Sequence, residues 1–160
     1  MRPRNTACSG DMRNGRLHGQ ASCVWANGGR YDGGWSNGMP HGQGVEVFAD
    51  GDRYEGQFWL GPRHGRGTYH FAKGGRYEGE WRDNRFDGQG TRFYGNGARY
   101  EGGWHADRYH GQGTIHFGDG SYCGGAWADG TMTGPGEGLS NGKPRSCKYD
   151  AEKNRVSFGR

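Results

Sequence analysis

Histidine is the residue of this chain whose type and spacing come closest to those of a metal-binding or catalytic site. A histidine column, interrupted once by aspartate, consists of His18, His41, His64, Asp87 and His110. Imidazole is a common metal ligand and acid–base group. Neighbouring members should lie about 10 Å apart if two strands separate them, too far for one zinc ion with bonds near 2 Å. A metal held between two chains is the alternative. We favour hydrogen bonding in a hairpin loop, because Asp87 interrupts the column without interrupting the surrounding pattern.

The cysteines are four in number and widely separated: Cys8, Cys23, Cys123 and Cys147. None belongs to a C-x-x-C pair, which argues against a zinc site. The segment Met1–Gly10 is polar and lacks the apolar stretch of a secretory signal. We therefore expect reduced thiols in a cytosolic protein.

Motifs of known catalytic chemistry are missing from the sequence. It contains no P-loop, no nucleophile elbow and no H-E-x-x-H. Strings such as Gly88-Gln89-Gly90 fall within expected strands and do not lead into a helix, so they are not dinucleotide signals. A repeat yields columns of identical residues, whereas catalysis needs an irregular set. We expect no enzyme, no catalytic residue, no bound metal and no cofactor.

A 23-residue internal repeat organises the chain. Tyr31, Tyr54, Tyr77 and Tyr100 are 23 residues apart, and Tyr122 follows after 22. They open the segments YDGGW, YEGQF, YEGEW, YEGGW and YCGGAW. One period upstream of Tyr31 lies Cys8, which indicates a degenerate first unit. The second half of each unit contains an H/D-G segment, a closing aromatic residue at Trp25, Phe48, Phe71, Tyr94 and Phe117, and a turn pair such as Asn96-Gly97.

Alternation within the units predicts β-strands. In the segment RYEGEW, the side chains of Tyr77, Gly79 and Trp81 should share one face, and those of Arg76, Glu78 and Glu80 the other. We expect a short loop at 82–87 and a tight hairpin turn at Asn96-Gly97. The predicted fold is all-β, an elongated single-layer meander of antiparallel β-hairpins with about five to six repeats.

Composition indicates an aromatic core. Leu, Ile, Val and Phe together number only 15 of 160 residues, whereas the chain contains 22 aromatic residues and 36 glycines. Aromatic side chains bury about 150–250 Å² each. Glycines in fixed columns, such as Gly79, Gly88 and Gly90, should let these rings lie across neighbouring strands. Arginines before and acids after each tyrosine should form a charged ladder on the opposite face.

Net positive charge is concentrated at the two ends of the chain. Residues 1–30 carry five basic and one acidic residue, 31–121 carry ten and twelve, and 122–160 carry six and four. A nucleic-acid-binding protein should concentrate positive charge on its main face, so we expect no nucleic-acid partner. We divide the chain into a basic N-terminal lead (1–7), a repeat array (8–130) and a C-terminal basic cap or tail (131–160).

The unit YEGEW-x₅-H/D-G-x-G-T-x-x-F-x-x-G resembles the MORN (membrane occupation and recognition nexus) repeat. The resemblance covers about three quarters of the chain, roughly residues 8–130. It implies a ribbon of successive β-hairpins. It also implies protein binding, scaffolding and sometimes dimerisation, with phospholipid binding proposed for some members.

We expect a non-enzymatic protein-interaction scaffold or structural subunit in a cytoplasmic or cytoskeletal assembly, with a cilium or flagellum as a narrower location. An aromatic groove would bind a partner's extended peptide or helix. The groove candidates are Trp35, Phe58, Trp81, Trp104, Tyr54, Tyr77 and Tyr100. The alternative is a membrane-associated module that binds anionic phospholipid through its basic ends, for which Lys143, Arg145 and Lys148 are the tail candidates. A homodimer is a further partner hypothesis.

Overall fold

The computed structural model describes residues 6–160, where all regular structure is β-strand and no helix occurs. The chain forms two compact units, Met1–Asn84 and Arg85–Arg160, which are described separately. The predicted lead, residues 1–7, lies outside the described residues except for Thr6 and Ala7. Within 6–160 no helix is long and apolar enough to cross a membrane.

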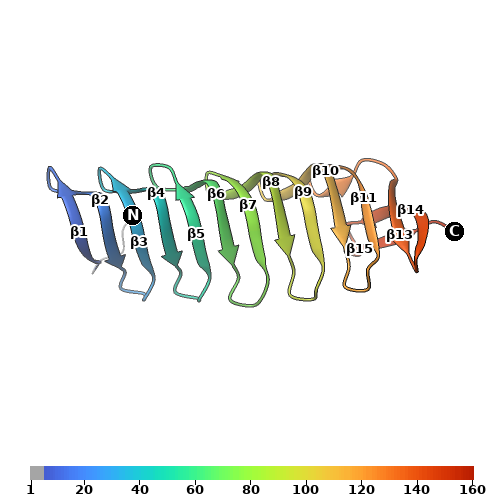
Figure 1. The fold of residues 1–160 in the computed structure, drawn as a ribbon, viewed down its shortest axis with the longest axis horizontal. Helices are drawn as coiled ribbons and strands as arrows, with labels where there is room; N and C mark the ends of the chain where they lie inside the picture. The colour runs from blue at the N-terminus through green and yellow to red at the C-terminus, as the bar shows by residue number, and fades with distance from the viewer. Residues whose placement is uncertain (1–5) are drawn as a thin grey trace. The chain divides into compact units, whose positions relative to one another are not determined.

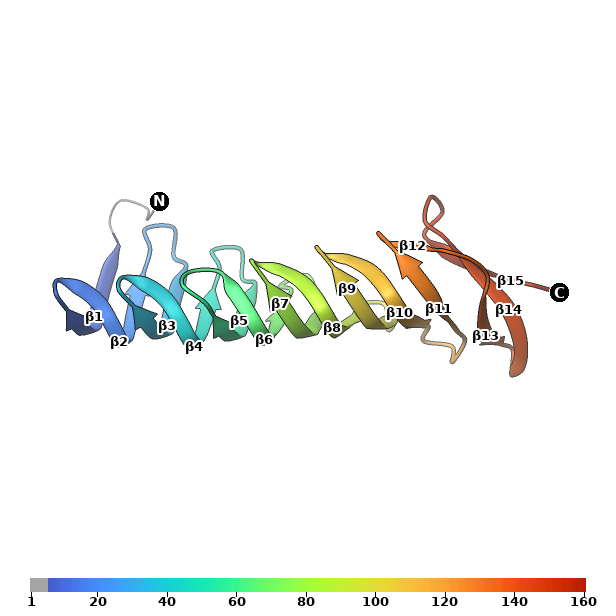
Figure 2. The ribbon, with the colours of Figure 1, turned by 90° about the horizontal axis from the view of Figure 1, so that it is seen from above.

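The first unit is a single-layer antiparallel meander. Its strands are β1 (Ala7–Arg13), β2 (Arg16–Val24), β3 (Arg30–Ser36), β4 (Met39–Val47), β5 (Arg53–Phe58), β6 (Arg63–His70) and β7 (Arg76–Arg82). Each strand pairs with the next along the chain, as Figure 1 shows. Seen from above, the strands arch, so that the sheet has a concave and a convex face (Figure 2).

The second unit continues the same pattern. Its strands are β8 (Arg85–Phe93), β9 (Arg99–His105), β10 (Arg108–His116), β11 (Tyr122–Ala128), β12 (Thr131–Met132), β13 (Gly136–Ser140), β14 (Lys143–Asp150) and β15 (Arg155–Phe158). The short β12 pairs with β11 beside the main path, and β13 to β15 extend the sheet from β11. The predicted all-β meander of hairpins is confirmed, and residues 131–160 form strands in it.

Each repeat has two turns, and the tight turn is the one for which we expected a loop. The two-residue hairpin turn is at Asp83-Asn84, where both residues have positive φ (48° and 69°), as a tight type I′ turn requires. At Asn96-Gly97 only the glycine has positive φ, at 87°. There a wider turn is closed by a bond from Tyr94 N–H to the Ala98 carbonyl (2.8 Å). The prediction of a tight turn at Asn96-Gly97 is therefore wrong.

A bulge in every second strand brings tyrosine and glycine together. Gly33 pairs with Gly44 and Trp35 with Pro40, so three residues of β4 lie opposite the single residue Gly34. The Tyr31 hydroxyl donates to the Gly34 carbonyl at 2.8 Å. Its ring lies across Gly44, where an added Cβ would overlap the phenol. Gly67 and Gly113 meet the rings of Tyr54 and Tyr100 in the same way, so the expected steric role is confirmed for this glycine column. Gly42 and Gly111, which are equivalent to Gly88, have open space around an added Cβ and instead have positive φ. Tyr54, Tyr77 and Tyr100 make the same bond three residues ahead.

The second aromatic column locks adjacent repeats together. The indole N–H of Trp35 donates to the Ala21 carbonyl at 3.0 Å, and that of Trp81 donates to the Gly67 carbonyl at 3.1 Å. Trp104 and Trp127 repeat this bond to Gly90 and Gly113. Tyrosine and tryptophan rings of one strand meet edge to face, with centroids 5.3 Å apart for Tyr77 and Trp81. Such pairs stabilise beyond their buried area.

The tyrosine position of the last repeat is occupied by a cysteine. Cys123 is fully buried and pairs with Ile115, which also pairs with Tyr100, whereas Tyr122 is 36% exposed. The period is therefore 23 throughout, and assigning Tyr122 to the column was wrong. Cys8, at the matching position of the first repeat, lies opposite Cys23.

Both of these cysteines form disulfides. Cys8 is bonded to Cys23, and Cys123 is bonded to Cys147. The expectation of reduced thiols is wrong for this structure, because strand pairing brings together cysteines that are 15 and 24 residues apart in sequence. Spacing in the sequence gave no sign of that proximity.

The charged ladder lies on the opposite face of the sheet, as expected. Arg53 and Glu55 are 3.0 Å apart, and Arg76 and Glu78 are 2.7 Å apart. These side chains are 41–56% exposed. Solvent-exposed ion pairs contribute about 0–1 kcal/mol, so the aromatic face carries most of the stability.

Replacing Trp81 should separate ring packing from hydrogen bonding. Trp81→Phe keeps a ring, as Phe58 does in the preceding repeat, but leaves the Gly67 carbonyl without its indole donor. We expect a loss of about 1–2 kcal/mol in unfolding free energy for Trp81→Phe and about 3–5 kcal/mol for Trp81→Ala. Chemical denaturation measures both. Arg82→Ala is the exposed control, and equal stability of Trp81→Ala and the parent chain would contradict the packing described.

The disulfide assignment predicts specific crosslinked peptides. Mass spectrometry of an unreduced digest should recover Cys8 linked to Cys23 and Cys123 linked to Cys147. Reduction should lower the melting temperature, because each crosslink of this size stabilises by about 2–4 kcal/mol. Four thiols that react in the denatured, unreduced chain would refute the assignment.

Candidate functional site

The groove candidates predicted from the sequence form the core of each unit. Relative exposure is 5% or less for every one of them: Trp35, Phe58, Trp81, Trp104, Tyr54, Tyr77 and Tyr100. Rings of the same strand and of the next strand but one cover one another, as the Tyr54 ring of β5 does with Phe58 of β5 and Trp81 of β7, both at 5.1 Å. A partner would therefore meet other side chains on the surface.

The basic tail candidates lie on β14. Lys143 and Lys148 are exposed, and Arg145 is half-buried. Because side chains alternate along a strand, Lys143 and Arg145 share one face and Lys148 lies on the other. These three cations therefore do not form a single positive surface.

Three members of the histidine column, His18, His41 and Asp87, join successive hairpin turns by hydrogen bonds, whereas His64 Nδ1 has no hydrogen-bond partner among the described residues. His18 Nδ1 accepts the Asn37 backbone N–H at 3.2 Å, and His41 Nδ1 accepts that of Leu60 at 3.2 Å. Asp87 accepts from Ala106 N–H in the same way, at 3.3 Å. The hairpin-loop role is thus confirmed for these residues. Within residues 6–160 no group of three or more His, Cys, Asp or Glu side chains is placed to hold a metal ion.

A second rung joins the same turns. Asn84 N–H donates to the Arg63 carbonyl at 3.0 Å, and Arg63 N–H donates to the Asn84 side chain at 2.9 Å. Phe86 and Asp107 make the same reciprocal pair. The turns at Gly38, Gly61, Asn84, Asp107 and Gly130 are each held by a backbone hydrogen bond to the preceding repeat, which makes this rim of the sheet a rigid support.

Arg63 covers the concave face in the middle of the first unit. Its guanidinium lies 5.1 Å from the Trp81 ring centroid and 5.4 Å from that of Tyr69, close enough for cation–π attraction. Glu46 lies on the same face, where burial raises its carboxyl pKa and the Arg63 charge opposes that rise. Arg63 Nη2 donates to the Asn84 carbonyl at 3.2 Å, whereas its buried Nε has no hydrogen-bond partner in the part of the chain that the structure describes. The guanidinium therefore packs over the rings with one donor unsatisfied.

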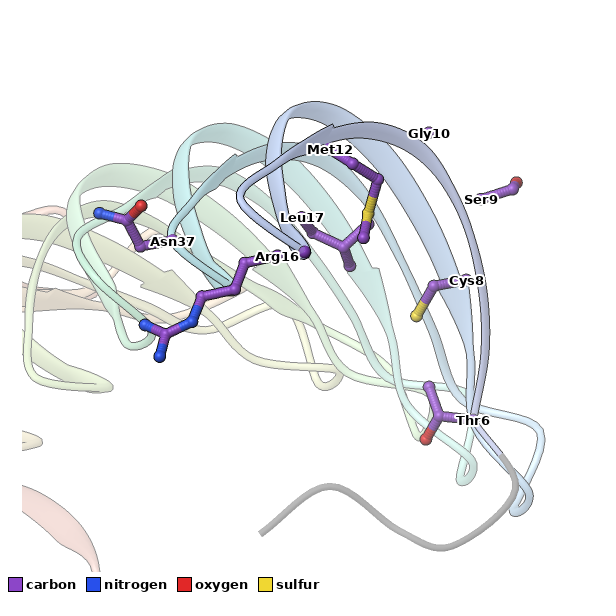
Figure 3. A pocket seen from close by; sticks show the side chains of 10 residues that line it. Thr6, Cys8, Ser9, Gly10, Met12, Arg16, Leu17 and Asn37 are labelled. Atoms are coloured by element: carbon purple, nitrogen blue, oxygen red, sulfur yellow. The ribbon is translucent and has the colours of Figure 1, made fainter.

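A hollow opens on the concave side of the first hairpin (Figure 3). Cys8, Met12 and Leu17 point into it, and Arg16 and Asn37 lie at its margin. Leu17 is buried, whereas Met12 is 59% exposed. The hollow combines apolar side chains with the hydroxyls of Thr6 and Ser9, the Asn37 amide and one cation, Arg16.

The most distinctive exposed surface is an apolar rim on the first unit. It consists of Met39, Trp59 and Leu60, which are 49%, 59% and 47% exposed. Trp59 and Leu60 belong to the turn between β5 and β6, and the Trp59 ring lies 4.7 Å from that of His41. Our sequence reasoning missed this rim. The available signal was the segment WLGP, which replaces the polar turns of the other repeats.

Comparison with known proteins assigns the family. A profile of the MORN repeat matches five consecutive segments: 8–30, 31–53, 54–76, 77–99 and 100–122. The chain belongs to the MORN repeat family, a family of binding modules that generally mediate protein–protein or membrane interaction and is not known as an enzyme family. No curated protein matches the chain.

A solved structure shares the fold. It is the SAS-4 (dCPAP) TCP domain of Drosophila melanogaster in complex with a proline-rich motif of Ana2 (dSTIL). The TM-score is 0.52 at 12% sequence identity, over 80% of this chain and 71% of that one. At this identity the likeness concerns the fold alone.

Exchanging the histidine of one rung should test the turn ladder. His41→Asp offers an acceptor to Leu60 N–H, as Asp87 does for Ala106, so we expect a melting temperature within about 2 °C of the parent. His41→Ala leaves that N–H without its acceptor and should cost about 1–2 kcal/mol, or several degrees. Thermal unfolding distinguishes the two variants, and an equal loss in both would contradict the proposed rung.

Proposed function

We propose that this protein is a non-enzymatic scaffold that binds another protein chain in a larger assembly. The observation that carries the proposal is the apolar rim of Met39, Trp59 and Leu60 on a support of hydrogen-bonded turns. Contiguous exposed apolar side chains mark interaction sites, and tryptophan is enriched among residues that dominate binding energy.

The family and the structural neighbour support a protein partner. MORN repeats are binding modules, and the TCP domain of the same fold was solved with a bound segment of another protein. An extended segment suits this chain too, because a sheet that is one layer thick has its convex face open to solvent.

The cellular location of the protein is part of the proposal. We propose a cytoplasmic assembly, with the cytoskeleton or a cilium as narrower locations, and a second copy of the chain as a further partner. Disulfides persist mainly in oxidising compartments, so the paired cysteines weigh against a reducing cytosol. Imaging of the tagged chain, with the redox state of its cysteines measured in the same cells, decides between these locations.

Affinity purification tests the scaffold function. The intact chain should enrich one or a few proteins reproducibly, as identified by mass spectrometry, and should not co-sediment with anionic vesicles. Residues 31–121 carry ten basic and twelve acidic residues, so partner affinity should change less than about threefold between 50 and 200 mM salt. Retention on vesicles that salt abolishes, with no protein enriched, would instead favour the membrane alternative.

A further inference from the structure

The convex face beside the apolar rim contains a depression, which we call the Trp59 site. It is lined by His41, Gly42, Gln43, Gln57, Phe58, Trp59, His64 and Gly65. All of these residues belong to the first unit. The lining contains an exposed indole, two imidazoles and two amides, but no carboxylate.

The turn at the Trp59 site departs from every equivalent turn of the chain. The residues at the Trp59 position elsewhere are Arg13, Ser36, Arg82, His105 and Ala128, and those at the Leu60 position are Asn14, Asn37, Asp83, Ala106 and Asp129. Leu60 has φ of +45°, a conformation that costs an ordinary L-residue about 1–2 kcal/mol. The equivalent residues share this conformation, as Ala106 does with φ of +47°, so the exposed apolar side chains are what distinguishes this turn and indicates a role in binding.

The turn ladder fixes the orientation of the donors in the Trp59 site. His41 Nδ1 accepts the Leu60 N–H, and a neutral imidazole that accepts at one nitrogen carries its proton on the other. His41, which lines the depression, therefore has its donor at Nε2 in the neutral form. Gln57 Oε1 accepts the Arg66 N–H at 2.8 Å, which leaves the Gln57 amide NH₂ to donate. Together with the indole N–H of Trp59, the site offers donors, while two of its acceptors are already engaged.

A ligand that matches this site is rich in carbonyl acceptors, poor in N–H donors and apolar on its rings. A proline-rich segment in the polyproline II conformation has these properties. Proline lacks an N–H, and the polyproline II backbone makes no internal hydrogen bonds, so its carbonyls stay open to donors. Proline rings pack against exposed aromatic faces, as in other aromatic-lined peptide sites.

We propose that the Trp59 site binds a proline-rich segment of the protein partner in the polyproline II conformation. Proline rings pack on Trp59 and Leu60, and the backbone carbonyls of the segment accept from Trp59 Nε1–H, His41 Nε2–H and the Gln57 amide. The inference rests on the proposed scaffold function and adds the chemistry of the partner and the residues that recognise it.

Titration of the intact chain with a blocked synthetic peptide, acetyl-(Pro-Pro-Ala)₄-amide, tests the site. The chain has six tryptophans, so indole N–H signals in a ¹H–¹⁵N spectrum are few, and Trp59→Ser identifies the one that belongs to Trp59. We expect this signal to move with a dissociation constant between about 10 μM and 1 mM. A peptide of equal length with alanine at every proline should leave the signal unchanged.

Three variants distinguish recognition from folding. The double change Trp59→Ser with Leu60→Asn recreates the turn of the second repeat and should weaken peptide binding at least tenfold without loss of melting temperature. His41→Asp retains the acceptor for Leu60 N–H but removes the Nε2 donor, so binding should fall at least threefold at unchanged stability. His105→Ser alters the position equivalent to Trp59 in the second unit and should leave affinity unchanged.

The remaining outcomes separate this inference from the scaffold function. Absence of binding at millimolar peptide, equal binding of the alanine peptide, or unchanged affinity of the Trp59→Ser, Leu60→Asn variant would each overturn the site. So would movement of the Trp59 signal by phosphatidylcholine–phosphatidylserine vesicles and not by the peptide. If a purified partner still binds the double variant with parental affinity, the Trp59 site is wrong and the scaffold function stands. If no protein partner is found at all, the scaffold function itself fails.

Discussion

The tyrosine ring that lies across a pair of glycines is the contact on which the repeats that begin with Tyr31, Tyr54, Tyr77 and Tyr100 depend. Tyr54 illustrates it: the ring covers Gly67, and the hydroxyl donates to the Gln57 carbonyl at 2.7 Å. The bulge opposite Gln57 interrupts regular strand pairing, so this hydroxyl satisfies a carbonyl inside the sheet. A buried carbonyl without a donor costs about 1–3 kcal/mol. Glycine and tyrosine therefore act as one unit, and neither is replaceable alone.

A core made in this way leaves other positions open to variation. On the concave face, Cys23, Glu46, Tyr69, Arg92 and Ile115 occupy equivalent places beside the tyrosines. Residues of such different chemistry can share a position because the ring and glycine contacts already define the strand register. The same freedom applies at the turns, where Leu60 and Asp83 have like conformations, with φ of 45° and 48°, and the next residues, Gly61 and Asn84, donate to backbone carbonyls of the preceding repeat. A single repeat can thus carry a recognition surface that its neighbours lack.

The repeat, its two faces and its aromatic core could be predicted from the sequence, because each follows from period and alternation. The turn geometry could not, since it depends on how many residues lie between the last paired residues of the two strands, as between His105 and Arg108. The disulfides escaped prediction because Cys8 meets Cys23 only once the strands are in register. The groove candidates were mistaken for surface because stacking of neighbouring repeats buries a ring such as Trp81 almost completely. Trp59 lies one residue beyond β5, where the alternation of strand residues makes no prediction. It is recognised as unusual only when its turn is compared with the other turns.

The position of the first disulfide has a mechanical consequence. A pulling force on the start of β1 would separate it from β2 by opening one rung after another, since the strands of a hairpin unzip from their free ends. The first rung joins Ala7 to Val24, and the second joins Cys8 to Cys23. Tension therefore reaches a covalent bond after one rung, before it reaches any tyrosine–glycine contact. A scaffold under load would then transmit force through its first hairpin instead of fraying there, and reduction of a single bond would make that end compliant.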